Sequence, residues 1–440
     1  MKHFFSIAIA SLIFLIPAGA FAFQASDPLG LVLTWQQDPT STMTIDWHTG
    51  TDDRNAEVAY RVADTDEWQS FTGSTMPYPH SDRLIHRVEL TGLNADTGYE
   101  FRTGPYSRIR KFRTAPADAS RPIRFAAGGD VRHRVEWMER MNRHVAGFSP
   151  DFIVWGGDLA YADGRSDRME RWYDFMDAMM HTLVTPDGFT IPVIAGLGNH
   201  EVIASWYNND DSELREGFPP YQQDDESRER IAPNYYKLFA FPGQPGYGVL
   251  DFGEYLSIIL LDTDHTNPVD GQQTEWLERT LAERTHIPNV VPNYHVPAFP
   301  SVRDPMGRTH SRIREHWVPL FEKYGVKLAF ENHDHVYKRT YPIRDGAVSA
   351  NGVVYIGDGA WGVGTREVGR EHKGQEWYLK RAVSDRHAVI VTIHGTLQHL
   401  LVVNEEGIII DEYPRTPHFD IPGRQLIPLW EKIVETEEEQ

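Results

Sequence analysis

The sequence feature that most constrains the fold of this chain is a set of five short polar segments, each of which begins where an apolar run ends. The apolar runs are residues 123–127, 152–155, 191–197, 290–291 and 326–330, and they are typical of buried strands. The segments that follow carry carboxylate, amide, phenol and imidazole groups at residues 129–130, 157–161, 198–201, 293–295 and 332–335. Because open α/β sheets bind ligands at the carboxyl ends of their strands, we expect these groups to converge. They are numerous enough to hold two metal ions.

Composition narrows the kinds of site and partner. The chain has no cysteine, so any metal must be held by oxygen and nitrogen ligands, and disulfides and thiol nucleophiles are excluded. A formal net charge of −20 argues against nucleic-acid partners and anionic membranes. Two bound cations would reverse that sign inside a pocket, so an anionic substrate remains compatible with the charge.

The N-terminus predicts a secretory signal peptide over residues 1–22. Lys2 and His3 precede an apolar run from residue 4 to 16, and Ala20-Phe21-Ala22 fits a cleavage site. A membrane anchor needs about 20 apolar residues, more than this run contains. We therefore expect a secreted or periplasmic protein with no membrane span.

The remaining chain predicts two folded regions and a tail. Residues 27–115 contain short alternating runs at 31–35, 43–47, 58–62, 84–90 and 99–102, typical of an antiparallel β-sandwich, with a tyrosine corner at Tyr99. Residues 123–404 alternate strands with helices, which we expect at 135–145, 168–183, 273–283 and 313–324. Two long polar insertions lie at 205–234 and 296–312, and residues 405–440 are predicted to form a polar tail.

The five segments resemble the motifs of the metallophosphoesterase superfamily, and Gly157-Asp158-Leu159-Ala160-Tyr161 is similar to the purple acid phosphatase branch. The family pattern is Gly-Asp, Gly-Asp-x-x-Tyr, Gly-Asn-His-Glu, Val-x-x-His and Gly-His-x-His. This chain departs from it at Pro292, where the pattern has valine, and at Asn332, where it has glycine. The resemblance implies an α/β sandwich of two mixed sheets flanked by helices, preceded by an all-β fibronectin type III-like sandwich.

The resemblance also implies two overlapping ligand sets. The first metal would be held by Asp130, Asp158, Tyr161 and His335, and the second by Asp158, Asn199, His295 and His333. In the family the first ion is ferric iron, coloured by charge transfer from the tyrosinate, and the second is zinc, manganese or iron. His200 would contact the substrate phosphate and protonate the leaving group, which suits an imidazole pKa. Glu201 would orient His200 or neighbouring loop groups, and a structural cap is the alternative.

Several residues depart from the pattern or allow two interpretations. In the related phosphodiesterase branch the residue two places after the first aspartate is a histidine ligand, but here it is Arg132, which cannot bind metal and so favours Tyr161 as the ligand. Arg132, Arg308 and His310 are candidate substrate-binding residues, with a surface ion pair or a solvated loop as the alternatives. We expect Asn332 to be tolerated because a tight turn accepts asparagine. We interpret Asp262, Asp264 and Asp358 as turn residues.

The leading hypothesis is a secreted, binuclear-metal phosphatase. Metal-bound hydroxide would attack the phosphorus of a phosphate monoester, and both ions would neutralise the developing charge. The alternative is a phosphodiesterase that uses the same metals on nucleotides or other diesters. A third hypothesis, a non-catalytic surface-binding protein, predicts eroded ligands, whereas all the expected ligands are present.

Overall fold

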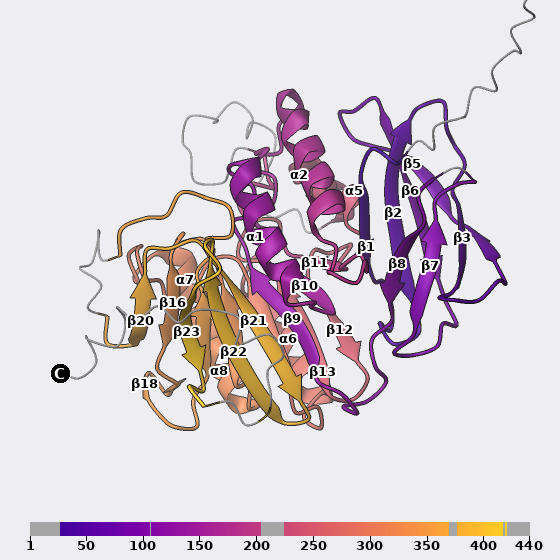
Figure 1. Cartoon of the computed structure of the whole chain (residues 1–440). Coiled ribbons are helices and arrows are strands. Elements are labelled where there is room, and N and C mark those ends of the chain that lie inside the picture. The colour runs from indigo at the N-terminus through magenta and orange to yellow at the C-terminus, as the bar shows by residue number, and fades with distance from the viewer. Residues whose placement is uncertain (1–26, 106, 204–223, 369–375, 417–418, 420–440) are drawn as a thin grey trace, which may run out of the picture.

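The computed structural model describes residues 27–105, 107–203, 224–368, 376–416 and 419 (Figure 1). The predicted signal peptide, most of the 205–234 insertion and most of the predicted tail lie outside these ranges. Within them, none of the helices is long and apolar enough to cross a membrane.

The N-terminal region is a sandwich of two antiparallel sheets. One sheet has the order β1 (Leu31–Thr34), β2 (Met43–Gly50), β6 (Arg83–Leu90) and β5 (Ser74–Pro77); the other has β4 (Gln69–Thr72), β3 (Glu57–Val62), β7 (Gly98–Arg102) and β8 (Arg110–Arg113). The predicted tyrosine corner is confirmed, because the Asn94 N–H donates to the Tyr99 hydroxyl at 2.9 Å. The sequence did not reveal β4, whose residues are all exposed and therefore lack an apolar pattern.

The second region contains two mixed sheets packed face to face. The six-stranded sheet has the order β11 (Val193–Ala195), β10 (Phe152–Trp155), β9 (Ile123–Gly128), β21 (His387–His394), β22 (Leu397–Asn404) and β23 (Ile409–Tyr413). The seven-stranded sheet has the order β12 (Gly248–Phe252), β13 (Leu256–Leu261), β14 (Val290–Tyr294), β15 (Leu328–Glu331), β19 (Val354–Gly357), β16 (Tyr337–Thr340) and β20 (Leu379–Val383), and β17 (Ile343–Arg344) pairs with β18 (Ala347–Val348) beside it. Apolar side chains such as Phe125 and Phe330, whose rings lie 6.2 Å apart, fill the space between the sheets. The predicted fold class is confirmed.

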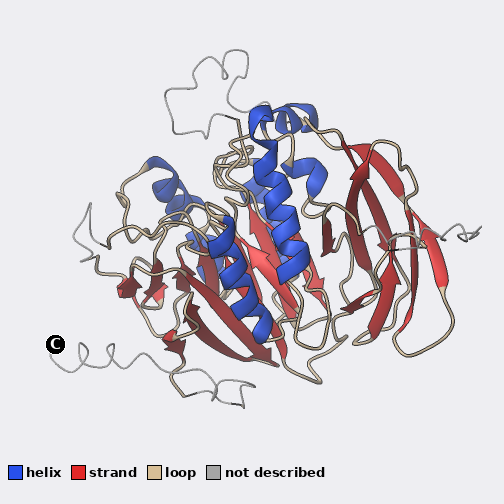
Figure 2. Ribbon diagram, turned by 45° about the horizontal axis from the view of Figure 1, so that its top comes forward, coloured by secondary structure: helices blue, strands red, loops and turns tan. Residues whose placement is uncertain are grey.

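Helices cover the outer faces of both sheets (Figures 1 and 2). The helices α1 (Val135–Gly147) and α2 (Met169–Thr182), the latter preceded by the short η1 (Ser166–Arg168), share an apolar cluster with the six-stranded sheet. The helices α6 (Gln272–Glu283), α7 (Arg308–His316) and α8 (Val318–Lys323) pack on the seven-stranded sheet, and α4 (Asp225–Ile231) and α5 (Tyr235–Leu238) are short connecting helices. The helix predicted at 313–324 is divided at Trp317, just before Pro319 in the first turn of α8.

Two predicted boundaries differ from the structure. The strand predicted at 290–291 continues to Tyr294, because Pro292 pairs with β13 without ending the strand. The tail predicted to begin at residue 405 includes β23, which pairs with β22, so the six-stranded sheet extends to Tyr413. The division of the chain into domains otherwise stays a prediction.

The sandwich and the α/β region share part of one core. Trp35, just after β1, contacts Phe152 of β10 and Phe252 of β12 edge to face, at 6.0 and 5.5 Å between ring centroids. The Arg87 guanidinium on β6 pairs with Asp46 at 2.8 Å and also donates to the Lys237 carbonyl at 3.0 Å. The sandwich is therefore fixed beside the α/β region on the side of α5 and β12.

Candidate metal centre

The polar segments lie at the ends of buried strands. Several of their residues adopt a left-handed backbone conformation, which residues other than glycine rarely take. Asp130 follows β9 with φ +55°, Asp158 follows β10 with φ +54°, and His333 follows β15 with φ +81°. Tyr161 and His335 are also left-handed, at φ +56° and +60°. Left-handed backbone is uncommon for residues with a side chain, and where such residues are buried they concentrate at functional sites.

One group of side chains gathers around Asp130. The ligand atoms of Asp130, Asp158 and His335 all lie within 4.8 Å of one another. His335 Nε2 is 2.9 Å from Asp130 Oδ1, and the Tyr161 hydroxyl is 3.0 Å from the same oxygen and 3.3 Å from His335 Nε2. The structure therefore brings together the four residues predicted to hold the first metal.

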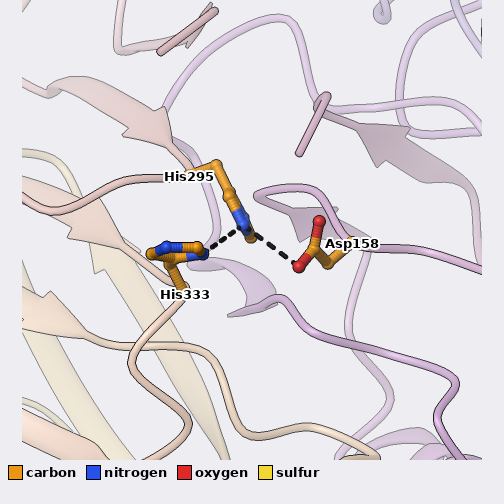
Figure 3. Close-up of side chains that lie close together, drawn as sticks. All are labelled: Asp158, His295 and His333. Atoms are coloured by element: carbon orange, nitrogen blue, oxygen red, sulfur yellow. Dashed lines mark hydrogen bonds and ion pairs between the residues drawn. The ribbon is translucent and has the colours of Figure 1, made fainter. Parts of the chain in front are cut away.

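A second group gathers around His295, and Figure 3 shows its core. His295 Nε2 lies 3.2 Å from Asp158 Oδ2, 3.0 Å from His333 Nδ1 and 3.0 Å from Asn199 Oδ1. The other ring nitrogen of His295 lies 2.9 Å from the Gly156 carbonyl. A proton on that nitrogen leaves Nε2 free as an electron-pair donor, as in histidines that bind metals. The four residues predicted for the second metal thus also converge.

Asp158 belongs to both groups. It is buried, and its Oδ2 has no hydrogen-bond partner of good geometry among the described residues. Burial opposes ionisation of this carboxyl, but His295 and His200 hold its pKa below the usual range. A buried, charged oxygen facing imidazole and carboxylate donors from two groups fits a bridging ligand between two cations.

Tyr161 also fits a cation site. Burial and the charges of Asp130 and Asp158 raise the pKa of its phenol well above the ordinary value. Without a cation the hydroxyl therefore stays protonated, and it donates to Asp130. A tyrosinate at this position requires a bound metal ion to offset the neighbouring carboxylates.

Glu201 holds the loops that carry the ligands. Its buried carboxylate accepts the backbone N–H groups of Asp158 at 2.8 Å, Leu159 at 2.7 Å and Gly198 at 2.8 Å. Burial, and then the Asp158 charge, raises the pKa of this carboxyl to about 7. Of the roles considered for Glu201, the contacts match the orientation of neighbouring loop groups, and the partner of the His200 ring is a different carboxylate.

That partner is Asp163, which the sequence analysis missed. His200 Nδ1 pairs with Asp163 Oδ1, and the other oxygen of Asp163 pairs with Arg168. The opposite ring nitrogen, His200 Nε2, lies 3.8 Å from Asp158 Oδ2, and 26% of the side chain is exposed. His200 therefore faces the shared ligand on one side and is oriented by a carboxylate on the other. Asp163-Gly164 resembles an ordinary turn in the sequence, which hid this role.

Asn332 is accommodated by its turn and by the packing of its side chain. Its φ is not left-handed; the left-handed residues are its neighbours His333 and His335. Its amide Nδ2 donates to the Tyr294 carbonyl at 2.8 Å, and the side chain lies where a Cβ on Gly129 or Gly156 would collide with it. Asn332 is tolerated as expected, and the Asp334 N–H donates to its carbonyl at 3.1 Å in a tight turn, but the fit depends on a space that two glycines leave open.

None of the three candidate substrate residues forms a described hydrogen bond or ion pair with a ligand side chain. Arg132 forms an ion pair with Asp174 of α2. His310 is buried, its Nδ1 lies 2.6 Å from the Pro297 carbonyl, and burial lowers its pKa. Arg308 is exposed at the start of α7. For all three, substrate binding stays a prediction, and in the described structure Arg132 matches its ion-pair alternative.

The aspartates interpreted as turn residues behave as such. Asp262 accepts the backbone N–H groups of His265, Thr266 and Asn267 at 2.7–2.9 Å. Asp264 pairs with Arg312 at 2.9 Å. Asp358 is left-handed at φ +85° and pairs with Ser301, and burial raises its pKa.

Comparison with known proteins gives a consistent result. A family model described as purple acid phosphatase, N-terminal domain, matches residues 28–114, and one described as calcineurin-like phosphoesterase matches residues 123–337. An uncharacterized protein of Mycobacterium tuberculosis is 24% identical over 357 residues, which cover 72% of this chain and 62% of that protein. Purple acid phosphatase 15 of Arabidopsis thaliana is 27% identical over 316 residues, which cover 64% of this chain and 54% of that protein. The chain thus spans less than two thirds of the length of these relatives.

Solved structures share the fold. A purple acid phosphatase, PPD1, from yellow lupin (Lupinus luteus) seeds superposes with a TM-score of 0.72 at 18% identity, covering 88% of this chain and 74% of that chain. The structure of PhoD superposes with a TM-score of 0.64 at 14% identity, covering 86% of each chain. At these identities the likeness concerns the fold alone.

Proposed function

The chain is a purple acid phosphatase-like member of the metallophosphoesterase superfamily, and we propose that it is a secreted phosphatase that hydrolyses phosphate monoesters at a two-metal centre. The observation that carries the proposal is Asp158, a single buried carboxylate common to two groups of ligand atoms. A binuclear site needs such a shared anionic oxygen, since two ions in one pocket repel each other.

The ligand residues divide as the family pattern implies. Asp130, Tyr161 and His335 would hold one ion, Asn199, His295 and His333 the other, and Asp158 both. Bound ions would supply positive charge at the phosphoryl oxygens and a water of lowered pKa. We propose ferric iron at the tyrosine side and zinc, manganese or iron at the other.

His200 is the residue we assign to proton transfer. The Asp163 carboxylate fixes its ring through Nδ1, which leaves Nε2 directed toward Asp158 and the site. A proton held on Nε2 can pass to the leaving-group oxygen as the ester bond breaks. Glu201 acts through the backbone, because it holds the loops of Asp158 and Gly198 in place.

Metal analysis combined with a visible spectrum tests the proposal. We expect two ions per chain, hydrolysis of 4-nitrophenyl phosphate, and a broad tyrosinate–iron band that disappears in Tyr161→Phe. Loss of hydrolysis on chelation and recovery on metal addition would complete the result. A fully active, colourless enzyme would overturn the iron assignment, and a metal-loaded protein without hydrolysis of any phosphate ester would overturn the activity.

Secretion is a separate part of the proposal. It rests on the sequence of residues 1–22, and expression of the full chain tests it. We expect a mature N-terminus just after Ala22 and recovery of the protein outside the cytoplasm. A protein that retains residues 1–22 in the cytoplasm would contradict this part alone.

A further inference from the structure

Two arginines flank the loop that carries His333 and His335. Arg303, on the loop between β14 and α7, donates from Nη1 to the His333 carbonyl at 2.7 Å and to Asp334 Oδ1 at 2.7 Å. One quarter of its side chain is exposed. Arg366, on the loop after β19, uses its backbone N–H to reach the His335 carbonyl at 3.1 Å. Both arginines are therefore anchored to the backbone of candidate metal ligands.

The Arg366 guanidinium differs from the other arginines near the site. It lies within electrostatic reach of Asp130, Tyr161 and Asp334, but it makes no hydrogen bond or ion pair with any described residue. Arg303 also lies within electrostatic reach of this guanidinium and repels it. By contrast, Arg132 pairs with Asp174 and Arg168 with Asp163. The Arg366 guanidinium thus lies within electrostatic reach of candidate metal ligands and of another cation, and its donors have no partner among the described residues.

A bound anion would further offset the repulsion between the two guanidinium groups, of which only Arg303 has a carboxylate partner, Asp334. Two guanidinium groups repel each other, and their unused donors favour planar, two-point contact with phosphate oxygens. Although the whole chain has a formal net charge of −20, the positive charges of these two arginines attract an anionic substrate locally.

The number of free oxygens on a phosphate ester decides which substrate gains most. A monoester has three acceptor oxygens on phosphorus and about two negative charges near neutral pH. A diester has one acceptor oxygen fewer and about one negative charge. An additional cation at the edge of the centre therefore finds a partner on a monoester that a diester lacks.

We propose that Arg366, with Arg303 beside it, binds the free phosphate oxygens of the substrate and selects monoesters over diesters. This inference rests on the proposed hydrolase function and adds the residue that distinguishes monoesters from diesters. Arg303 also holds the His333 loop, so Arg366 is the position at which recognition can be tested without disturbing a ligand loop.

The test compares two aryl esters in the metal-loaded protein. For Arg366→Met we expect kcat/KM for 4-nitrophenyl phosphate to fall about 10- to 100-fold, as for loss of a charge-assisted hydrogen bond, chiefly through KM. For bis(4-nitrophenyl) phosphate we expect a change within about threefold. The inhibition constant of inorganic phosphate should rise with the monoester KM. Arg366→Lys should recover part of the loss, because it keeps the charge without the planar fork.

Arg279→Met is the matched control, because Arg279 is exposed on α6. It should leave kcat/KM for both esters unchanged. Equal losses for both esters in Arg366→Met, or no loss for either, would overturn the inference while leaving the proposed function intact. If the wild-type protein hydrolyses neither ester, the proposed function fails, and calorimetric titration with inorganic phosphate decides the inference. A dissociation constant unchanged by Arg366→Met would then overturn it.

Discussion

The sandwich and the ligand-bearing strand ends both contain left-handed aspartates and histidines, which are exposed in the sandwich but buried or half-buried at the strand ends. In the sandwich, Asp64, His80 and Asp96 have φ values of +64°, +60° and +48°, and all three are exposed. They are turn residues of types that adopt a left-handed backbone at little energetic cost. No packed surroundings are needed to hold them.

At the strand ends the same conformation depends on its neighbours. The Asp130 N–H donates to the Gly157 carbonyl at 3.0 Å, and the His335 N–H donates to the Asp358 carbonyl at 2.8 Å. The His333 N–H donates to the Asp130 carboxylate at 2.9 Å. Residue type and φ are therefore alike in the two regions. What distinguishes a functional left-handed residue is that buried partners enforce it and leave a ligand atom directed into the site.

The largest expected effect is that of Asp158→Ala. Since both ligand groups share this carboxylate, we expect loss of both ions and a fall in kcat/KM on the order of 1000-fold or more. Metal content and hydrolysis of an aryl phosphate would be measured together. Asp64→Ala, at an exposed left-handed position in the sandwich, is the control and should retain both. An Asp158→Ala protein that kept its activity would remove the distinction between the two regions.

Asp264 tests whether burial of a left-handed residue is sufficient for function. Its φ is +67°, it is buried, and it pairs with Arg312 and accepts the Val269 N–H at 2.9 Å. We expect Asp264→Ala to lower the free energy of unfolding by about 3 kcal/mol, because a partly buried guanidinium loses a partner. The activity per folded molecule should not change. Denaturant unfolding and kcat/KM separate the two, and a loss of kcat/KM at unchanged stability would make Asp264 a site residue.

Asp163 is left-handed at φ +56° and tests the orientation of His200. We expect Asp163→Asn to lower kcat about 10-fold, as for loss of a carboxylate partner of a working imidazole, with KM nearly constant. The loss should be greater for an alkyl than for an aryl phosphate, because a poorer leaving group depends more on protonation. Asp167→Asn, at an exposed aspartate paired with Arg165, is the matched control. Equal losses for both leaving groups would argue against the orienting role.

The smallest effect is expected in the sandwich itself. Asp64→Gly relieves the strain of a side chain at a left-handed position, which favours the folded state. It also raises the conformational entropy of the unfolded chain, which favours unfolding, so the two effects nearly cancel. We expect the free energy of unfolding to change by less than about 1 kcal/mol, with hydrolysis unchanged. A loss greater than about 2 kcal/mol would show that Asp64 is held by its surroundings as the strand-end residues are.

The sequence predicted what the backbone decides. Apolar runs located β9 and β10 closely, and a residue that directly follows a buried strand has little freedom in where it lies. This is why the predicted ligands were found together. Prediction from the sequence failed for β4, which lacks an apolar pattern, and misplaced the end of β14, which contains a proline.

Long side chains and packing were harder to predict. The Arg132 guanidinium is directed by Asp174, which belongs to a helix more than forty residues further along the chain. The fit of Asn332 depends on Gly129 and Gly156, which come from two other strand ends. The partner of His200 is set by the path of the loop after Tyr161, and a local pattern contains none of this information. These contacts arise only after the sheets have assembled.

The three hydrogen bonds that Glu201 accepts have a consequence for how the protein acquires its ions. Because a side chain of the protein ties the Asp158 and Gly198 loops together, the ligand geometry is set when the chain folds. Cations then enter a finished framework and need not drive its assembly, unlike in small domains that are unfolded without metal. The ions present in a given preparation would accordingly record the supply and exchange rates of the surrounding medium, and one fold could be isolated with different metal pairs.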